Sequence, residues 1–299
     1  MVKDPDAANG TFRGSVRVLG NGVELPEYGY GTFPLKEELR ATVPFAIRHG
    51  CRLVDTSDNY MNETYVGEGL REVDAGHVIL VTKFSQPLRT KRLERCFEES
   101  ERKLGGRIDV YLLHWPYPFL WKLQWRKIEK LYLAGRCKAI GVCNFKAKHL
   151  KRLLAFCKVK PLINQIERHP MYQQSDAVSF CREHGIQVMS YSPLARMDAR
   201  LMKSPVLLRI AESHGKTVPQ VVIRWNIDRG HIPIPASRTE EHILGNFDVS
   251  DFTLSGEELE EIDALESGCR IRFDPDTRFG WKDKLRFLRC RLKLLGRRI

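Results

Sequence analysis

The stretch HVILVTKFSQPLRTKRLERCFEESERKLGGRIDVYLLH, residues 77–114, decides the fold. It begins with the apolar run HVILVTKF (77–84) and ends with a second run, IDVYLLH (108–114). Between them Leu93, Phe97 and Leu104 recur at helical spacing before Gly105, a residue type that commonly ends helices. Near-continuous apolar runs are typical of strands covered on both faces. The stretch therefore predicts a strand, a helix and a second, parallel strand.

The same alternation continues along most of the chain. Ser or Thr opens the amphipathic stretches and Gly closes them, as expected for helices. Right-handed crossovers between strands give a parallel sheet, and eight repeats predict an α/β fold of the (β/α)8 TIM barrel type. The eight predicted strands are YGYGT (28–32), CRLVDT (51–56), HVILVTKF (77–84), IDVYLLH (108–114), CKAIGVCN (137–144), PLINQIER (161–168), IQVMSYSP (186–193) and HIPIPAS (231–237).

The segments outside this series predict two further elements. SVRVLGNGVELP (15–26) places an Asn-Gly turn between two alternating runs, which predicts an N-terminal β-hairpin over the N-terminal mouth of the barrel. Ser255 and Glu258 form a capping box that opens a late helix. We expect residues 1–276 to form the barrel domain and residues 277–299 to form a basic C-terminal tail.

The tail carries much of the net charge of +12. Residues 282–299 hold eight Lys or Arg against one Asp, a net charge of +7. Leucines recur within it at helical spacing, so one hypothesis is a basic amphipathic helix that contacts an anionic surface or partner. The alternative is a solvated helix whose leucines lie on the barrel. The leucines are Leu285, Leu288, Leu292 and Leu295.

Composition is that of a soluble globular protein. The chain is 42% hydrophobic and 29% charged, without an apolar run long enough to span a membrane and without a signal-peptide pattern at residue 1. We expect a cytoplasmic protein with no transmembrane segment and no nucleic-acid partner. Its eight cysteines include no C-x-x-C pair, which favours reduced structural thiols and no metal site.

Four polar residues lie at or just after three of the predicted strands: Asp55, Tyr60, Lys83 and His114. Strand carboxyl ends meet at one face of a barrel, where active sites are built. A Tyr hydroxyl can donate a proton to a carbonyl oxygen, and a neighbouring ammonium would favour the phenolate. Asp55 would hold Lys83 charged, and His114 would orient the substrate or relay a proton. Alone, each has a structural alternative: a cap for the Asp, core packing for the His and the Tyr.

The segments LVDTSDNYMNE (53–63), VTKF (81–84) and LLHWP (112–116) resemble the catalytic tetrad of the aldo-keto reductase family. The resemblance covers residues 16–276. Within the family, the sequence is similar to short-loop, bacterial-type members. It implies that Tyr60 is the general acid/base, that Lys83 and Asp55 tune it, and that His114 orients the substrate. The implied function is NAD(P)H-dependent reduction of aldehydes or ketones to alcohols. The alternative is a nucleotide-binding sensor or scaffold that acts through the basic tail.

No G-x-G-x-x-G follows a predicted strand, so a Rossmann domain is not supported and the barrel mouth must hold the nicotinamide. GVCNF (141–145) resembles the family's GVSNF, which implies that Asn144 and Cys143 contact the carboxamide. Gln165 resembles the other carboxamide ligand. Tyr191 is similar to the aromatic residue on which the nicotinamide stacks, although strand packing is its structural alternative. Ser192 and Leu194 resemble pyrophosphate contacts.

The expected 2′-phosphate site departs from the family pattern. Ala236 and His242 stand where relatives carry a Lys and an Arg. Loss of a charge-assisted contact costs about 1.5–3 kcal/mol, or about tenfold or more in affinity. NADPH is the first choice of cofactor, and NADH or dual use is its competitor. The remaining residues assigned to this site are Ser237, Arg238 and Asn246.

Aromatic residues gather around the expected substrate site, which predicts an apolar cleft for a small aldehyde or ketone. Phe33, Phe84 and Trp115 are the candidate substrate contacts. The loops after the strands are short, which favours an open site that tolerates several carbonyl compounds. The aromatic residues Phe273, Phe279 and Trp281 either fold over this site or belong to the tail.

Overall fold

A computed structural model describes residues 15–296, so residues 1–14 of the predicted barrel domain and 297–299 of the predicted tail lie outside the described residues. The chain is built around a parallel sheet of eight strands in the order β10-β9-β8-β7-β6-β5-β4-β3. The strands are β3 (Tyr30–Gly31), β4 (Leu53–Asp55), β5 (Ile79–Phe84), β6 (Val110–Leu113), β7 (Ala139–Cys143), β8 (Ile163–Glu167), β9 (Gln187–Tyr191) and β10 (Ile232–Pro233).

Two backbone hydrogen bonds join the first strand of this sheet to the last. The Gly29 N–H donates to the Pro233 carbonyl at 3.0 Å, and the Gly31 N–H donates to the Pro235 carbonyl at 2.9 Å. The sheet is therefore closed, and the predicted (β/α)8 TIM barrel is confirmed. β3 and β10 are shorter than the predicted runs because Pro233 and Pro235 have no N–H to extend the ladder.

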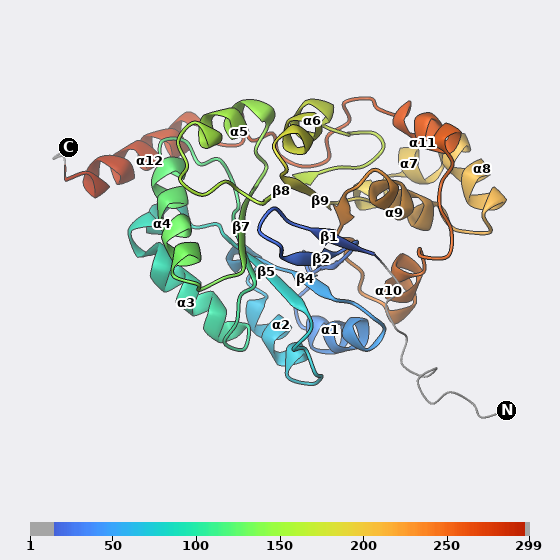
Figure 1. Cartoon of the computed structure of the whole chain (residues 1–299), viewed down its shortest axis with the longest axis horizontal. Helices are drawn as coiled ribbons and strands as arrows, with labels where there is room; N and C mark the ends of the chain where they lie inside the picture. The colour runs from blue at the N-terminus through green and yellow to red at the C-terminus, as the bar shows by residue number, and fades with distance from the viewer. Residues whose placement is uncertain (1–14, 297–299) are drawn as a thin grey trace.

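Helices fill the connections between strands and surround the sheet (Figure 1). The predicted helix start at Ser255 is confirmed, since Ser255 forms a capping box with Glu258, and Thr217 forms a second capping box with Gln220. The helices are α1 (Leu39–Arg48), α2 (Glu63–Leu70), α3 (Leu93–Lys103), α4 (Trp121–Leu133), α5 (Ala147–Leu154), α6 (Ser175–Glu183), α7 (Ala199–Met202), α8 (Pro205–Ser213), α9 (Val218–Asp228), α10 (Glu240–Phe247), α11 (Gly256–Asp263) and α12 (Trp281–Leu294).

The barrel strands bury side chains on both faces. Side chains such as Val81 and Val110 form an apolar cluster inside the barrel, whereas Leu80 and Phe84 belong to the layer between the sheet and the helices. Because successive side chains of a strand point to opposite faces, Lys83 faces the interior as Val81 does. This alternation places a charged side chain inside the barrel at the carboxyl end of β5.

The N-terminal hairpin pairs β1 (Val16–Val18) with β2 (Glu24–Pro26) in antiparallel register. Leu19 and Leu25 belong to the apolar cluster inside the barrel. A Cβ on Gly20 would lie 3.8 Å from Leu162, the residue that precedes β8, so the hairpin covers the amino ends of the strands. Figure 1 shows it crossing the middle of the ring of helices. The hairpin does not cover the opposite end of the barrel, where the strands have their carboxyl ends.

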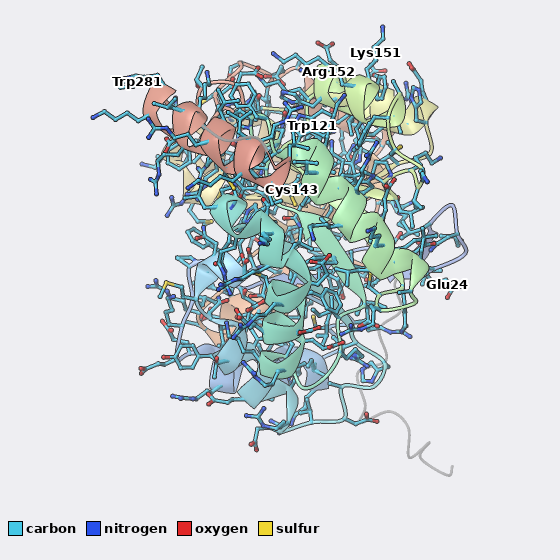
Figure 2. The ribbon with its side chains drawn as sticks, turned by 90° about the vertical axis from the view of Figure 1, so that its left-hand side faces the viewer. Glu24, Trp121, Cys143, Lys151, Arg152 and Trp281 are labelled. Carbon is cyan, nitrogen blue, oxygen red and sulfur yellow. The ribbon has the colours of Figure 1, made fainter. Side chains whose placement is uncertain are left out.

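The tail folds as α12 against the outside of the helix layer (Figure 2). Phe287, Cys290 and Leu294 pack against the body, whereas Leu285 and Leu295 are 38% and 48% exposed. The alternative in which the leucine stripe lies on the barrel is therefore contradicted at Leu285 and Leu295, whereas Leu288 and Leu292 are half-buried. Among residues 15–296, no helix is long and apolar enough to cross a membrane.

Candidate active site

A cavity of about 1280 Å³ opens at the carboxyl ends of the strands. The loops after β3, β4, β6, β9 and β10 line it together with a C-terminal segment at residues 272–278. Asp55, Tyr60 and His114 contribute to its wall, while Lys83 lies directly behind them and is fully buried. The four predicted catalytic residues thus lie around one end of a cleft large enough for a dinucleotide and a small substrate.

Lys83 and Asp55 form a buried ion pair, with Nζ 2.6 Å from the Asp55 Oδ2. Nζ also donates to the Thr56 carbonyl at 2.7 Å and to the Tyr60 hydroxyl at 3.4 Å, so each of its three N–H donors has an acceptor. The Gln165 amide donates to the other Asp55 oxygen at 2.7 Å. Burial alone would lower the pKa of Lys83, but Asp55 outweighs it and raises that pKa, so the ammonium stays charged.

Tyr60 ends a short 3-10 helix, η2 (Asp58–Tyr60), whose first turn is capped by Ser57. Lys36 donates to its carbonyl, and the Phe33 ring lies 5.0 Å from its ring. Burial raises the pKa of Tyr60 to about 12, and Lys83 opposes that rise without cancelling it. Lys83 thus favours the phenolate, as expected, but burial has the larger effect on the pKa. The Tyr60 hydroxyl is therefore protonated at neutral pH.

His114 is neutral in this environment. Burial lowers its pKa well below the usual value, and the positive charges of Lys83, Arg278 and Arg272 lower it further. Its Nδ1 lies 3.1 Å from the Ser57 hydroxyl and also contacts the hydroxyl of Ser85. The ring is thereby held in one orientation at the cavity wall. A neutral imidazole can direct a carbonyl oxygen without competing for the proton of Tyr60.

Eight of the ten predicted nucleotide contacts line the cavity, along the loops after β7, β9 and β10. A hydrogen-bond chain fixes part of this wall, because Tyr191 donates to the Asn144 side-chain oxygen at 2.7 Å and the Asn144 amide donates to the His114 carbonyl at 3.0 Å. The eight residues are Asn144, Tyr191, Ser192, Leu194, Ser237, Arg238, His242 and Asn246.

Comparison with known proteins agrees with this arrangement, since residues 19–267 match the aldo/keto reductase family. The chain belongs to the aldo/keto reductase family. It is 40% identical to glyoxal reductase of Bacillus subtilis, over 86% of this chain and 95% of that protein. It is 37% identical to methylglyoxal reductase DkgA of Escherichia coli, over 86% of this chain and 96% of that protein.

A Bombyx mori aldo-keto reductase solved in complex with NADP superposes with a TM-score of 0.82 at 30% identity, covering 90% of this chain and 97% of that one. The predicted family, barrel fold and enzyme class are thus confirmed. This aldo/keto reductase is an oxidoreductase.

Two predicted nucleotide contacts of this aldo/keto reductase lie behind the cavity wall. Cys143 is fully buried in the apolar cluster inside the barrel, and Gln165 is 1% exposed. The Gln165 amide donates to Asp55 and also contacts the Met189 sulfur at 3.1 Å. In the structure Gln165 orients the Asp55 carboxylate through this hydrogen bond. The sequence did not indicate this contact, because Asp55 lies on a strand distant in sequence.

The substrate end of the cavity is lined by Phe33, Trp115 and Phe273. Phe84 does not line it, because it alternates with Lys83 on β5 and is fully buried under the helices. The predicted substrate contact of Phe84 is therefore wrong. Phe273 folds over the site, whereas Trp281 is 71% exposed and belongs to the tail.

The C-terminal segment is anchored over the cavity by charge. Glu167 accepts hydrogen bonds from the backbone N–H groups of Ile271 and Arg272, at 2.6 and 3.0 Å. Lys146 forms ion pairs with Asp274 and Asp276 at 2.9 and 2.8 Å. These anchors bring two arginines to the cavity, Arg272 and Arg278, which the sequence reasoning did not single out. The two acidic residues of the DPD segment, 274–276, were the feature of the sequence that could have indicated an anchored C-terminal segment.

We expect replacement of Lys83 by Met to lower the rate of carbonyl reduction and to destabilise the fold. Removal of the ammonium raises the Tyr60 pKa further and leaves the Asp55 carboxylate buried without a cation, at a cost of about 3–5 kcal/mol. Denaturant unfolding measures that loss. The double variant Asp55→Asn with Lys83→Met should be more stable than Lys83→Met alone, because no buried charge remains unpaired. Equal stability of the two variants would contradict the coupling.

Proposed function

We propose that this aldo/keto reductase reduces aldehydes or ketones to alcohols with NADPH, and that Tyr60 supplies the proton. The observation that carries the proposal is the Lys83 ammonium held between the Asp55 carboxylate at 2.6 Å and the Tyr60 hydroxyl at 3.4 Å, beside a cavity of dinucleotide size. The names of the two bacterial relatives, glyoxal reductase and methylglyoxal reductase, support small carbonyl substrates.

The lining of the cavity fits a nicotinamide dinucleotide. Tyr191 offers an aromatic face, Asn144 an amide, and Ser237 and Asn246 a hydrogen-bonded polar pair 2.8 Å apart at the far end. Arg238 lines the same end with its side chain 64% exposed, and its nearest acid, Glu38, is 3.8 Å away. That guanidinium is available for a phosphate, which supports NADPH although Ala236 and His242 supply no permanent charge. The Bombyx mori structure with NADP supports the same choice.

When bound, the reduced nicotinamide supplies the hydride that adds to the carbonyl carbon. Tyr60 donates its proton to the carbonyl oxygen as negative charge develops there, which completes the alcohol. The charged Lys83 stabilises the phenolate that Tyr60 leaves behind, and Asp55 keeps Lys83 aimed at it. Neutral His114 holds the carbonyl oxygen near the phenol. Solvent reprotonates Tyr60 before the next turnover.

We expect replacement of Tyr60 by Phe to lower the kcat for an aldehyde such as methylglyoxal by about 100- to 10,000-fold, the usual contribution of a general acid. NADPH binding, followed by fluorescence titration, should be unchanged because the ring remains. The Tyr60 pKa of about 12 means that the protonated, active form persists below that value. The wild-type rate of reduction should therefore not fall between neutral and moderately alkaline pH. A Tyr60→Phe variant with wild-type kcat would refute the role.

We expect replacement of Arg238 by Gln to weaken NADPH binding by about tenfold or more and to leave NADH binding unchanged, because one charge-assisted contact to the 2′-phosphate is lost. The converse change, Ala236→Lys, should tighten NADPH binding only. Titration of both cofactors against both variants measures this. Equal weakening of NADPH and NADH by Arg238→Gln would show that the 2′-phosphate is bound elsewhere.

A further inference from the structure

Arg272 and Arg278 both line the cavity at its substrate end, beside Trp115. The guanidinium of Arg272 lies 5.1 Å from the Phe33 ring centroid, and that of Arg278 lies 4.2 Å from the Trp115 ring centroid. Both are close enough to His114 to lower its pKa. Two permanent cations therefore stand around the position that a substrate carbonyl would occupy.

Neither side chain has an ion pair or hydrogen bond among the described residues. Nearby arginines do, since Arg270 pairs with Asp274 and contacts the Tyr172 hydroxyl. The Nε of Arg278 is buried without a hydrogen-bond partner, and Asp283 acts on this arginine only from beyond ion-pair distance. Two like charges held together without an acid are unfavourable unless a ligand supplies the counter-charge.

We infer that this pair is an anion subsite, and that the preferred substrates carry a carboxylate on the side of the carbonyl away from the nicotinamide. The inference rests on the proposed reductase function. Phe33, Trp115 and Phe273 supply an apolar surface between the carbonyl and the anion. The chemical class is then an aldehyde or ketone acid with an apolar or aromatic body, bound by charge-assisted hydrogen bonds to guanidinium.

The test compares 4-carboxybenzaldehyde with methyl 4-formylbenzoate, which differ only in the charge at one end. We expect the wild type to prefer the carboxylate by about tenfold or more in kcat/KM, the value of one charge-assisted contact. Arg272→Gln with Arg278→Gln should abolish that preference, because kcat/KM should fall by about tenfold more for the carboxylate than for the ester. Arg71→Gln, which removes an exposed charge from the end of α2, should keep it.

Reduction of both compounds at equal kcat/KM would overturn the anion subsite and leave the reductase function standing. Reduction of neither compound, together with no turnover of methylglyoxal, would instead count against the proposed function. An equal loss of both activities in the double variant would show that the arginines only maintain the fold of the C-terminal segment, and would also overturn the inference.

A second, independent observation concerns α12. Phe287, Cys290 and Leu294 pack against the body, so the opposite side of the helix faces away from it. Figure 2 shows α12 on the outer surface with Trp281 at its amino end. Trp281 and the leucines follow one another at intervals of four and three residues, which places them on that outward side. The stripe is Trp281, Leu285, Leu288, Leu292 and Leu295.

Cations border this outward stripe on both sides. At 3.6 residues per turn, four of them fall along one border and two along the other. None of the six forms an ion pair with an acid among residues 15–296. The first border holds Lys282, Arg286, Arg289 and Lys293, and the second holds Lys284 and Arg291.

We propose that this face of α12 binds the surface of an anionic lipid membrane, with the stripe among the upper acyl chains and the cations at the headgroups. A second copy of α12 would bring six cations against six, which disfavours self-association. Trp281 suits the boundary between headgroups and acyl chains. An apolar stripe flanked by Lys and Arg is the pattern of helices that lie in the plane of a membrane.

We expect the full chain to sediment with vesicles of phosphatidylcholine and phosphatidylserine but not with phosphatidylcholine alone, and to dissociate as salt rises. Trp281 fluorescence should shift to the blue on binding. Leu285→Glu with Leu292→Glu should abolish binding and leave aldehyde reduction unchanged. Leu133→Glu, at an exposed leucine of α4, should keep binding. Failure of the wild type to bind anionic vesicles, or dimerisation that the α12 variant removes, would overturn the proposal.

Discussion

The ion pair between Lys83 and Asp55 is the interaction on which the site depends. Burial of two charges costs several kcal/mol per ion unless their contacts are nearly ideal. Here the ammonium has three acceptors and the carboxylate has a second donor in Gln165. Lys83 lies on β5, its acceptors lie at residues 55–60, and Gln165 lies on β8, so these groups meet only when the barrel is closed around them.

The positive charge of Lys83 changes the pKa values of other groups in the cleft. Burial and the charge of Lys83 lower the pKa of His114, which keeps the imidazole neutral. Burial raises the pKa of Tyr60 by more than Lys83 lowers it, which keeps the phenol protonated. This protonation state is the one that the proposed reduction requires. Arg272 and Arg278 add positive charge at the substrate end, and Arg238 adds it at the nucleotide end. An electropositive cleft suits an anionic cofactor and the acidic substrates inferred for it.

The C-terminal part of the chain contributes to the cavity wall and to the outer surface of the protein. Residues 270–279 are anchored by Glu167 and Lys146 so that Phe273 lines the cavity beside Phe33 and Trp115. α12 then leaves the barrel, packs through Phe287 beside Tyr117, and turns its leucines outward. The barrel strands and their loops carry the polar groups of the site, and the segment that follows the barrel forms part of the wall of the cavity.

The sequence alone predicted the barrel, the four polar residues that meet at the carboxyl ends of its strands, and eight of the residues that line the cavity beside them. Alternation of apolar runs with amphipathic stretches is a local pattern, and a parallel barrel always brings strand carboxyl ends to one face. Only the tertiary structure decided which side of each strand faces the cavity at Phe84, that Gln165 holds Asp55, and that burial outweighs Lys83 at Tyr60. Only it brought Arg272 and Arg278 to the cavity and left Leu285 and Leu295 of α12 exposed. These features depend on burial and on contacts between residues distant in sequence, which no local pattern records.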